Sequence, residues 1–159
     1  MARPTTDGRT IVASNRRARR DFEILDTLEA GLVLAGSEVK SLREGRVQLA
    51  DAYARPRDGE LWLHGVHISP WAQASGRWQP EPDRHRKLLM HRREIDRLAA
   101  RVEQDRLTVV PLSIYFKDGR AKVEVALARR KRQHDKRATL ARRDADREAE
   151  RAMARRGRG

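Results

Sequence analysis

The sequence predicts a mainly β protein: a small antiparallel barrel or strongly curved sheet of about six strands, with two or three helices. Several short stretches alternate between apolar and polar residues, which is the pattern of a strand with one buried face. The pair Asp118-Gly119 separates two such stretches, as a two-residue hairpin turn does. Six short strands bury their apolar faces most easily by closing on themselves, so a barrel is expected.

The first strand and the first helix are predicted in residues 22–45. Residues 22–34 alternate with one lapse at Asp26, and this alternation favours a strand. Its apolar residues share one parity: Phe22, Ile24, Leu28 and Ala30. Residues 36–45 predict a helix of about two turns, which Ser37 can cap and Gly45 can end.

The middle of the chain is expected to form two strands, a loop and a second helix. Residues 47–68 contain two strands around a Pro-Arg-Asp-Gly turn, and residues 69–83 have the proline content of a loop. The buried candidates in the two strands are Leu61, Leu63, Val66 and Ile68. Helix is predicted after Asp83, which can serve as its N-cap. Apolar residues at helical spacing or its multiples support it: Leu88, Ile95, Leu98 and Val102.

Residues 107–128 give the clearest local signal, a β-hairpin around Asp118-Gly119. One predicted face holds Leu112, Ile114 and Phe116, and it can meet Val123, Val125 and Leu127 across the ladder. Pro111 has no N–H to donate, so an edge or a bulge is expected there.

Charge divides the chain into a mildly basic body and a strongly basic tail. The protein has 159 residues, a net charge of +13 and no cysteine. Residues 129–159 hold 13 Lys and Arg against 5 Asp and Glu, a net charge of +8. Such charge predicts a polyanionic partner or a membrane surface. No apolar run is long enough for a membrane helix and the N-terminus lacks the apolar core of a secretory signal, so a cytoplasmic location is expected.

The tail has the composition of a helix that needs a partner. Alanines recur at helical spacing at 141, 145, 149 and 152, but methyl groups bury little area. We therefore expect residues 129–159 to be disordered alone and helical against a partner. A solvated tail that only aids solubility is the alternative.

The sequence gives little support for a catalytic site or a metal site. His64 and His67 lie three apart, and on a strand they would point to opposite faces, so no metal site and no cofactor are expected. The chain has no glycine-rich phosphate loop, and its serines and paired carboxylates sit in no catalytic motif. An enzyme is accordingly disfavoured.

Three basic clusters favour a nucleic-acid partner: residues 15–20, 84–87 and 129–137. Taken singly, each cluster could be a solvated face. Glu29, followed by Ala30-Gly31, is an acidic exception that could accept hydrogen bonds from a base edge or a sugar hydroxyl. A ribosomal or general RNA-binding protein with a tail threaded into RNA remains an alternative.

Four short segments together resemble the SmpB family, the SsrA-binding proteins of bacterial trans-translation. They read EAG (29–31), EVKSLR (38–43), RKLL (86–89) and DKR (135–137), and the resemblance covers roughly residues 15–150. It implies a barrel of the oligonucleotide-binding type and a monomeric RNA-binding adaptor that is not an enzyme. The adaptor would bind the tRNA-like domain of tmRNA and bring it to stalled ribosomes. EF-Tu and alanyl-tRNA synthetase would be indirect partners through tmRNA.

The resemblance also implies two sets of site residues and three regions. A flexible N-terminus of residues 1–14 would precede a tmRNA-binding domain of residues 15–128 and the tail. Body residues implied to contact tmRNA are Asn15, Arg16, Arg17, Arg19, Glu29, Lys40, Arg43, Arg84, Arg86, Lys87, Leu89 and His91. Tail residues implied to lie in the ribosomal decoding centre, where the tail would read the empty messenger channel, are Lys131, Arg132, His134, Asp135, Lys136 and Arg137.

Two departures from the family pattern bear on these expectations. Many members have Gly-Lys-Lys where this chain has Arg130-Lys131-Arg132, so a glycine hinge is lost at Arg130. The loop at 70–82 also diverges, which puts an RNA contact from that loop in doubt.

Overall fold

The computed structural model describes residues 8–74, 76, 78–131 and 133–156, with side chains of the last range described for 143–155. Its strands are β1 (Arg9–Ser14), β2 (Phe22–Leu32), β3 (Val47–Gln48), β4 (Tyr53–Arg57), β5 (Glu60–His64), β6 (His67–Ile68), β7 (Arg86–Leu89), β8 (Thr108–Lys117) and β9 (Arg120–Arg130). Its helices are α1 (Arg16–Asp21), α2 (Gly36–Arg43), α3 (Arg92–Asp105) and α4 (Gln133–Arg156).

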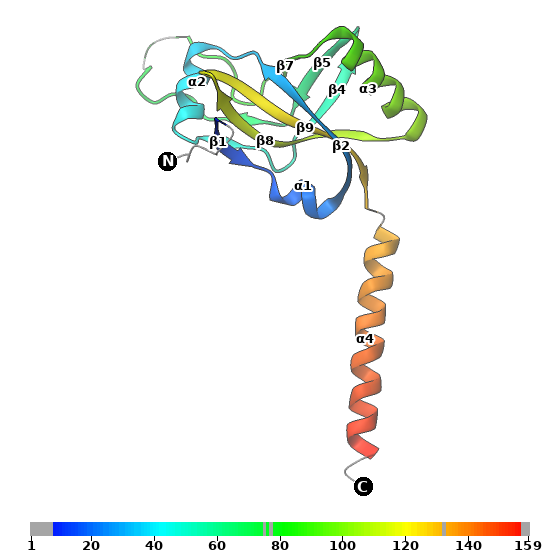
Figure 1. Cartoon of the computed structure of the whole chain (residues 1–159). Helices are drawn as coiled ribbons and strands as arrows, with labels where there is room; N and C mark the ends of the chain where they lie inside the picture. Colours follow the sequence, from blue (N-terminus) through cyan, green and yellow to red (C-terminus); the bar gives the residue numbers. More distant parts are fainter. Residues whose placement is uncertain (1–7, 75, 77, 132, 157–159) are drawn as a thin grey trace.

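Six antiparallel strands close a ring in the order β8-β4-β5-β7-β2-β9, and β9 returns to β8 (Figure 1). Closure leaves these strands no long free edge, which is how small barrels avoid pairing with other chains. β1 pairs with β8 beside the ring, and β3 and β6 form a separate two-stranded sheet. The predicted mainly β, antiparallel, barrel-like fold is confirmed.

The main core fills the ring and extends to the helices at its ends. Leu61, Leu63 and Ile114 are fully buried there, and Ile95 and Leu98 of α3 and Leu42 of α2 join the same cluster. The four apolar residues predicted to be buried between 61 and 68 are all buried. A second cluster lies under α1, on the outer side of β8 and β9: Ala18, Val110, Leu112, Ala126 and Ala128.

Two β-bulges shift residues that the sequence placed on one face. The register of β2 slips between Ile24 and Asp26, so Ile24 packs in the cluster under α1 while Leu28 and Ala30 face the main core. This slip is the physical cause of the lapse in alternation at Asp26, because a bulge inserts one residue into the period of two.

The second bulge lies in β8. The register slips between Pro111 and Ser113, which confirms the irregularity expected at Pro111. It also corrects the predicted face: Leu112 packs in the cluster under α1, whereas Ile114 and Phe116 face the main core. The Asp118-Gly119 hairpin itself is confirmed, with φ of 52° and 74°, both values suited to a type I′ turn.

Three local predictions need correction. Helix does not begin after Asp83: residues 86–89 form β7, and α3 starts only at Arg92. Lys87 and Leu89 alternate with buried Arg86 and Leu88, a short period-two pattern hidden by its charged residues. The N-cap of α2 is Ala35 and not Ser37, with the Glu38 side chain accepting a hydrogen bond from the Ala35 N–H. Residues 9–14, expected to be flexible, form β1.

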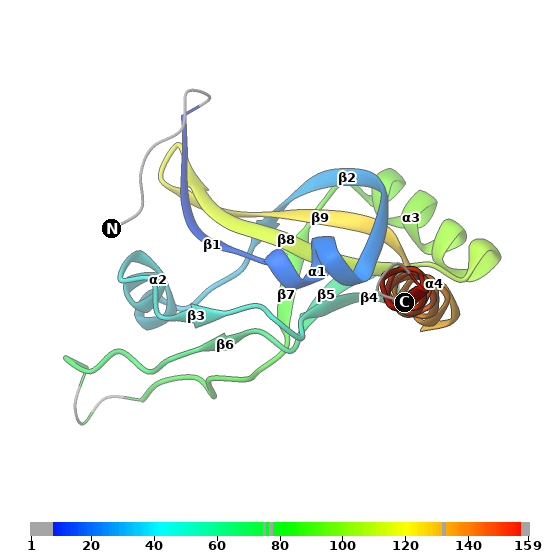
Figure 2. The same cartoon turned by 90° about the horizontal axis from the view of Figure 1, so that it is seen from below.

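The C-terminal helix α4 leaves the barrel at the end of β9 and projects away from it (Figures 1 and 2). A hydrogen bond from the Lys131 N–H to the Asp21 carbonyl is the final backbone link to α1 before this helix. In the segment 143–155 every described side chain is exposed. Within the described part of the chain, no helix combines the length and apolar content needed to cross a bilayer.

Candidate nucleic-acid interface

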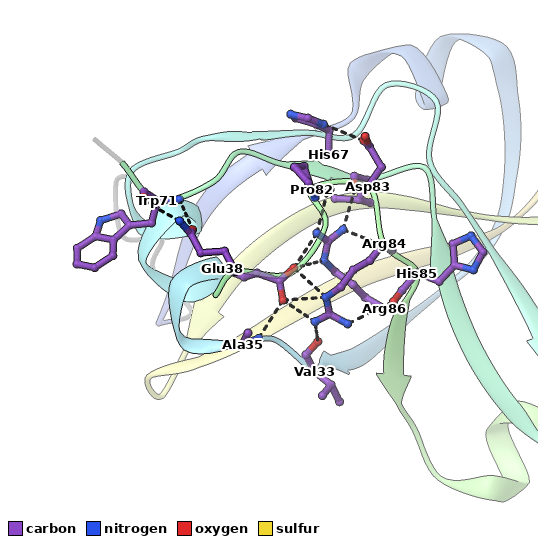
Figure 3. A network of polar contacts seen from close by, with 12 residues as sticks. Val33, Ala35, Glu38, His67, Trp71, Pro82, Asp83, Arg84, His85 and Arg86 are labelled. Atoms are coloured by element: carbon purple, nitrogen blue, oxygen red, sulfur yellow. Dashed lines mark hydrogen bonds and ion pairs between the residues drawn. The ribbon is translucent and has the colours of Figure 1, made fainter. Parts of the chain in front are cut away.

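A buried carboxylate, Glu38, joins α2 to β7 through two arginines (Figure 3). Arg86 donates to Glu38 at 2.7 Å, and its other nitrogens donate to the carbonyls of Val66 and Pro82 at 2.7 and 2.9 Å. Arg84 donates to both oxygens of Glu38. Glu38 is 4 % exposed and Arg86 0 % exposed, so this cluster fixes α2 against β7 and the 66–82 loop.

The protonation behaviour of this cluster follows from burial and pairing. Burial favours the neutral acid of Glu38, but hydrogen bonds from Arg84, the Ala35 N–H and Arg86 outweigh it and lower the pKa of Glu38. Burial likewise lowers the pKa of Arg86, against the opposing effect of Glu38. A buried ion pair is costly to break, because the remaining charge is left without a partner. Both groups therefore stay charged and paired at neutral pH.

The helix held by this cluster presents its basic side chains beside a shallow groove. The groove runs between α2 and the β8–β9 hairpin and is lined by Gly31, Leu32, Leu34, Val39, Leu89, Phe116, Gly119, Arg120, Ala121 and Lys122. Arg43 lies over the Phe116 ring at 4.3 Å, and Lys40 lies over the Trp71 ring at 4.0 Å. Leu89 is 55 % exposed at the groove, opposite Gly31 in the ladder. An apolar floor with cations at its edges suits a ligand with flat, apolar and anionic parts.

Glu29 lies on the outer face of β2, and Gly31, two residues further along the strand, is on the same face. Its carboxylate accepts a hydrogen bond from the Tyr115 hydroxyl at 2.5 Å, and Arg9 and Lys117 lie within 3.9 Å. The Tyr115 hydrogen bond is the largest influence, and with Lys117, Lys122 and Arg9 it lowers the pKa of Glu29 despite partial burial. Glu29 is therefore an oriented, exposed carboxylate in basic surroundings, free to accept further hydrogen bonds.

The whole chain resembles one family of known proteins. The model of the SmpB protein family matches residues 12–155. The chain belongs to the SmpB family. The SsrA-binding protein of Salinispora tropica is 56 % identical over 157 residues, covering 98 % of both chains. That of Mycolicibacterium smegmatis is 57 % identical over 150 residues, covering 94 % of this chain and 92 % of its own.

A solved structure supports the same assignment. A chain in the structure described as "tmRNA-SmpB: a journey to the center of the bacterial ribosome" is 50 % identical, with a TM-score of 0.64. The match covers 76 % of this chain and 84 % of that one. The family expected from the four short sequence segments is thus confirmed, together with the barrel that it implies.

Two residues expected to contact RNA are instead buried parts of the SmpB fold. Arg86 is wholly engaged with Glu38 and with backbone carbonyls. Asn15 is 3 % exposed: its side chain caps α1 by accepting from the Ala18 N–H and donates to the carbonyls of Leu49 and Pro111. Both side chains direct their polar groups into the fold, so they position the surface and do not form it.

The remaining body residues fall into separate groups. Leu89 lines the groove, Arg43 lies over Phe116 at its edge, and Glu29 lies on the adjoining face of β2. Lys40 lies on α2 over the Trp71 ring. Arg16, Arg17 and Arg19 are exposed on α1, where Arg17 pairs with Asp51 at 3.2 Å and Arg19 lies 3.8 Å from Glu124.

Arg84, Lys87 and His91 lie outside the groove. Arg84 is partly exposed beside Glu38, Lys87 pairs with Glu60 at 3.0 Å, and His91 is exposed at the start of α3. Of the twelve predicted body residues, the structure therefore gathers Arg43, Leu89 and Glu29 at one place.

The predicted tail residues are only partly covered. Lys131 is exposed immediately after β9. Arg132 lies outside the described residues. The backbone of His134, Asp135, Lys136 and Arg137 belongs to the first turns of α4, while their side chains lie outside the described residues. Their assignment to a decoding site stays a prediction.

Sequence reasoning missed the groove residues Phe116, Arg120 and Lys122 and the Glu29 partner Tyr115. The predicted hairpin could have pointed to Lys122, because Lys122 lies opposite Gly31 in the ladder and both residues line the groove. Tyr115 could not be found in this way, since its link to Glu29 crosses a third strand.

His64 and His67 do not share one strand, contrary to the sequence prediction, because β5 ends at His64 and β6 begins at His67. His64 stacks against Tyr53, while His67 contacts Asp83 at 2.8 Å. Among the described residues, no group of three His, Asp or Glu side chains could hold a metal ion.

Proposed function

We propose that this protein is an RNA-binding adaptor of trans-translation, which holds the tRNA-like domain of tmRNA on its barrel and delivers it to stalled ribosomes. The observation that carries the proposal is the groove between α2 and the β8–β9 hairpin, which Lys122 and exposed Leu89 line and beside which Arg43 lies over Phe116. It is supported by relatives called SsrA-binding proteins and by the similar chain in a tmRNA-SmpB structure. The adaptor acts by binding alone, in the cytoplasm, and performs no reaction.

Each groove residue suits a different part of a folded RNA. Arg43 and Lys40 supply charge for phosphates, and the guanidinium of Arg43 can also bind them through two hydrogen bonds. Exposed Leu89 offers an apolar surface on which an exposed base can lie. Glu29 accepts hydrogen bonds only, which phosphates cannot donate, so it selects sugar hydroxyls or base amino groups. The Glu29 carboxylate therefore lets the surface prefer a folded RNA with exposed hydroxyl or amino groups over any other polyanion, which positive charge alone cannot do.

The tail supplies the second contact, to the ribosome. Residues 129–159 carry a net charge of +8, enough to follow a channel walled by RNA. In the proposal, the segment from Lys131 to Arg137 occupies the place of a codon–anticodon pair, and α4 continues along the empty messenger channel. EF-Tu and alanyl-tRNA synthetase act on the complex through tmRNA.

The test is a filter-binding comparison of wild type, Glu29→Gln and a chain ending at Lys131, each with the tRNA-like domain and with a duplex of equal charge. Because Glu29→Gln removes a charged acceptor, we expect it to weaken binding of the tRNA-like domain about 10-fold and to leave duplex binding unchanged or slightly stronger. The truncated chain should keep its preference for the tRNA-like domain and fail to support tagging on stalled ribosomes. Equal affinity of wild type for both RNAs would show a generic polyanion binder.

A further inference from the structure

A row of three neighbouring rings lies along the outer face of β4 and β5 and ends just before β7. Tyr53 and His64 are register partners on β4 and β5, with ring centroids 5.1 Å apart and planes 6° from parallel. His85, just before β7, adds a third ring, with its centroid 3.8 Å from that of His64 and its plane tilted by 48°. Tyr53 and His64 come from paired strands and His85 from the residue that enters a third, so the barrel positions all three rings.

A second row of cations and one more ring runs beside the first. Arg55 pairs with Trp62 across the ladder, and Trp62 pairs with Lys87. Arg57 follows on β4, opposite Glu60. Together these side chains form what we call the ring-and-cation face: Tyr53, Arg55, Arg57, Trp62, His64, His85 and Lys87.

Burial and charge distinguish this face from an ordinary barrel surface. The inward residues of the same strands, such as Ala54, Leu61 and Leu63, are buried and complete the core without these rings. Tyr53 is 39 % exposed, and Arg55, Arg57 and His85 are also exposed. The face has three permanent cations, Arg55, Arg57 and Lys87, and two nearby carboxylates, Asp58 and Glu60. Burial, together with nearby cations, lowers the pKa of His64, and this keeps its ring neutral for stacking.

Tyr53 also borders two grooves. One is lined by Arg17, Asp21 and Phe22 of the α1 region and by Arg130, the last residue of β9. The other separates β4 from α3 and includes Arg55 and Glu103. The ring row therefore begins at a groove that also contains Arg130, the last residue of β9 before the chain continues toward α4.

We propose that the ring-and-cation face is a second RNA-binding surface, which stacks unpaired bases of ribosomal RNA. A base of any kind can stack on the ring at the end of the row, because every base has a flat π face. Arg55 and Arg57 would neutralise the phosphates next to that base. The groove shared with Arg130 joins this face to the start of the tail, which in the proposed function enters the ribosome. The tRNA-like domain is held instead at the groove beside Leu89. This inference rests on the proposed function for the identity of the RNA.

The test uses full-length protein in complex with tmRNA and measures affinity for stalled ribosomes, alongside the affinity of the protein for the isolated tRNA-like domain. Tyr53→Leu removes the outermost ring, Tyr53→Phe retains it, and Arg55→Gln removes a cation. The matched control for the cation is Arg97→Gln, an exposed arginine of α3. Photocrosslinking from benzoylphenylalanine at position 53 identifies the RNA that is touched.

We expect Tyr53→Leu and Arg55→Gln to weaken ribosome association about 10-fold and to change affinity for the tRNA-like domain less than about 2-fold. Tyr53→Phe and Arg97→Gln should match wild type, and the crosslink should fall on ribosomal RNA. Melting curves check folding, and His85→Ala, at the other end of the row, replaces Tyr53→Leu if that variant unfolds.

Two outcomes would overturn the inference. The first is unchanged ribosome affinity in the folded variants, and the second is a loss of affinity only for the tRNA-like domain with a crosslink only to tmRNA. Failure of the proposed function is distinguishable, because it appears in wild type as no preference for the tRNA-like domain.

Discussion

At the scale of single residues, two side chains that resemble RNA contacts in the sequence are structural. Arg86 belongs to a basic cluster, and nothing in its neighbours reveals that Glu38, 48 positions away, binds it. Asn15 likewise precedes a run of arginines yet caps α1 from a buried position. Sequence alone identifies charge but not which charges meet a partner inside the fold, since that depends on strand register.

The Glu38–Arg86 pair should therefore be among the costliest to break. Glu38→Gln leaves Arg86 charged and buried with a weaker partner, and we expect it to lower the free energy of unfolding by about 3–5 kcal/mol. Arg84→Gln, at a partly exposed partner of the same carboxylate, should cost less, about 1 kcal/mol. Urea denaturation at pH 7 measures both. A double replacement, Glu38→Leu with Arg86→Met, should recover much of the loss, and failure to do so would mean that the pair does not act as a unit.

The same pair predicts a pH dependence with a defined sign. The pKa of Glu38 is lowered from 4.5 in the folded state, so its contribution is complete above about pH 4.5 and is lost as the pH falls through the folded value. The difference in stability between wild type and Glu38→Gln should therefore narrow on acidification below that point.

At the scale of elements, prediction succeeded where a local pattern is complete. The hairpin at 118–119, the helix at 36–43 and the first strand at 22–32 all follow from alternation and turn residues. It failed where a short element is interrupted by charge, as in β7, or where a bulge changes the face, as at Ile24 and Leu112. The lapse at Asp26 and the proline at 111 mark where the bulges lie, but which residues change face depends on how two strands pair.

Two glycines provide a matched test of this local chemistry. Gly119 has φ of +74°, and an added methyl group would meet open space, so only backbone strain opposes Gly119→Ala. We expect a loss of about 1 kcal/mol in the free energy of unfolding. Gly36, also with open space, lies at the first position of α2 without positive φ, so Gly36→Ala should be neutral or stabilising. Equal effects of both substitutions in thermal denaturation would contradict the assigned turn.

At the scale of the whole molecule, charge and shape are divided between body and tail. The family was predictable from four short segments. The groove that brings together Arg43, Leu89 and Lys122 was not, because it needs α2, β7 and the β8–β9 hairpin together. The tail holds most of the net charge, whereas the body holds the oriented groups such as Glu29. Affinity and selectivity should accordingly depend on different regions.

This division predicts different salt dependences for full-length and shortened protein. A duplex is bound through its phosphates alone. For a duplex, ending the chain at Lys131 should reduce the magnitude of the slope of log binding constant against log salt concentration by at least about 2. The reason is that each phosphate no longer neutralised lowers this magnitude by roughly 0.9. On the tRNA-like domain the slope should change by less than about 1, since oriented groups of the body dominate there. Filter binding at several salt concentrations gives both slopes, and an equal reduction on the two RNAs would assign selectivity to the tail.

The exit of the chain from β9 has a mechanical consequence. β9 is paired along its length with β2 on one side and with β8 on the other, and α4 follows directly from its end. A tail gripped in a channel would pull β9 lengthwise against both neighbours, so their hydrogen bonds would be loaded together in shear and not opened one by one. The barrel can thus transmit tension from a moving ribosome to its bound RNA without unravelling.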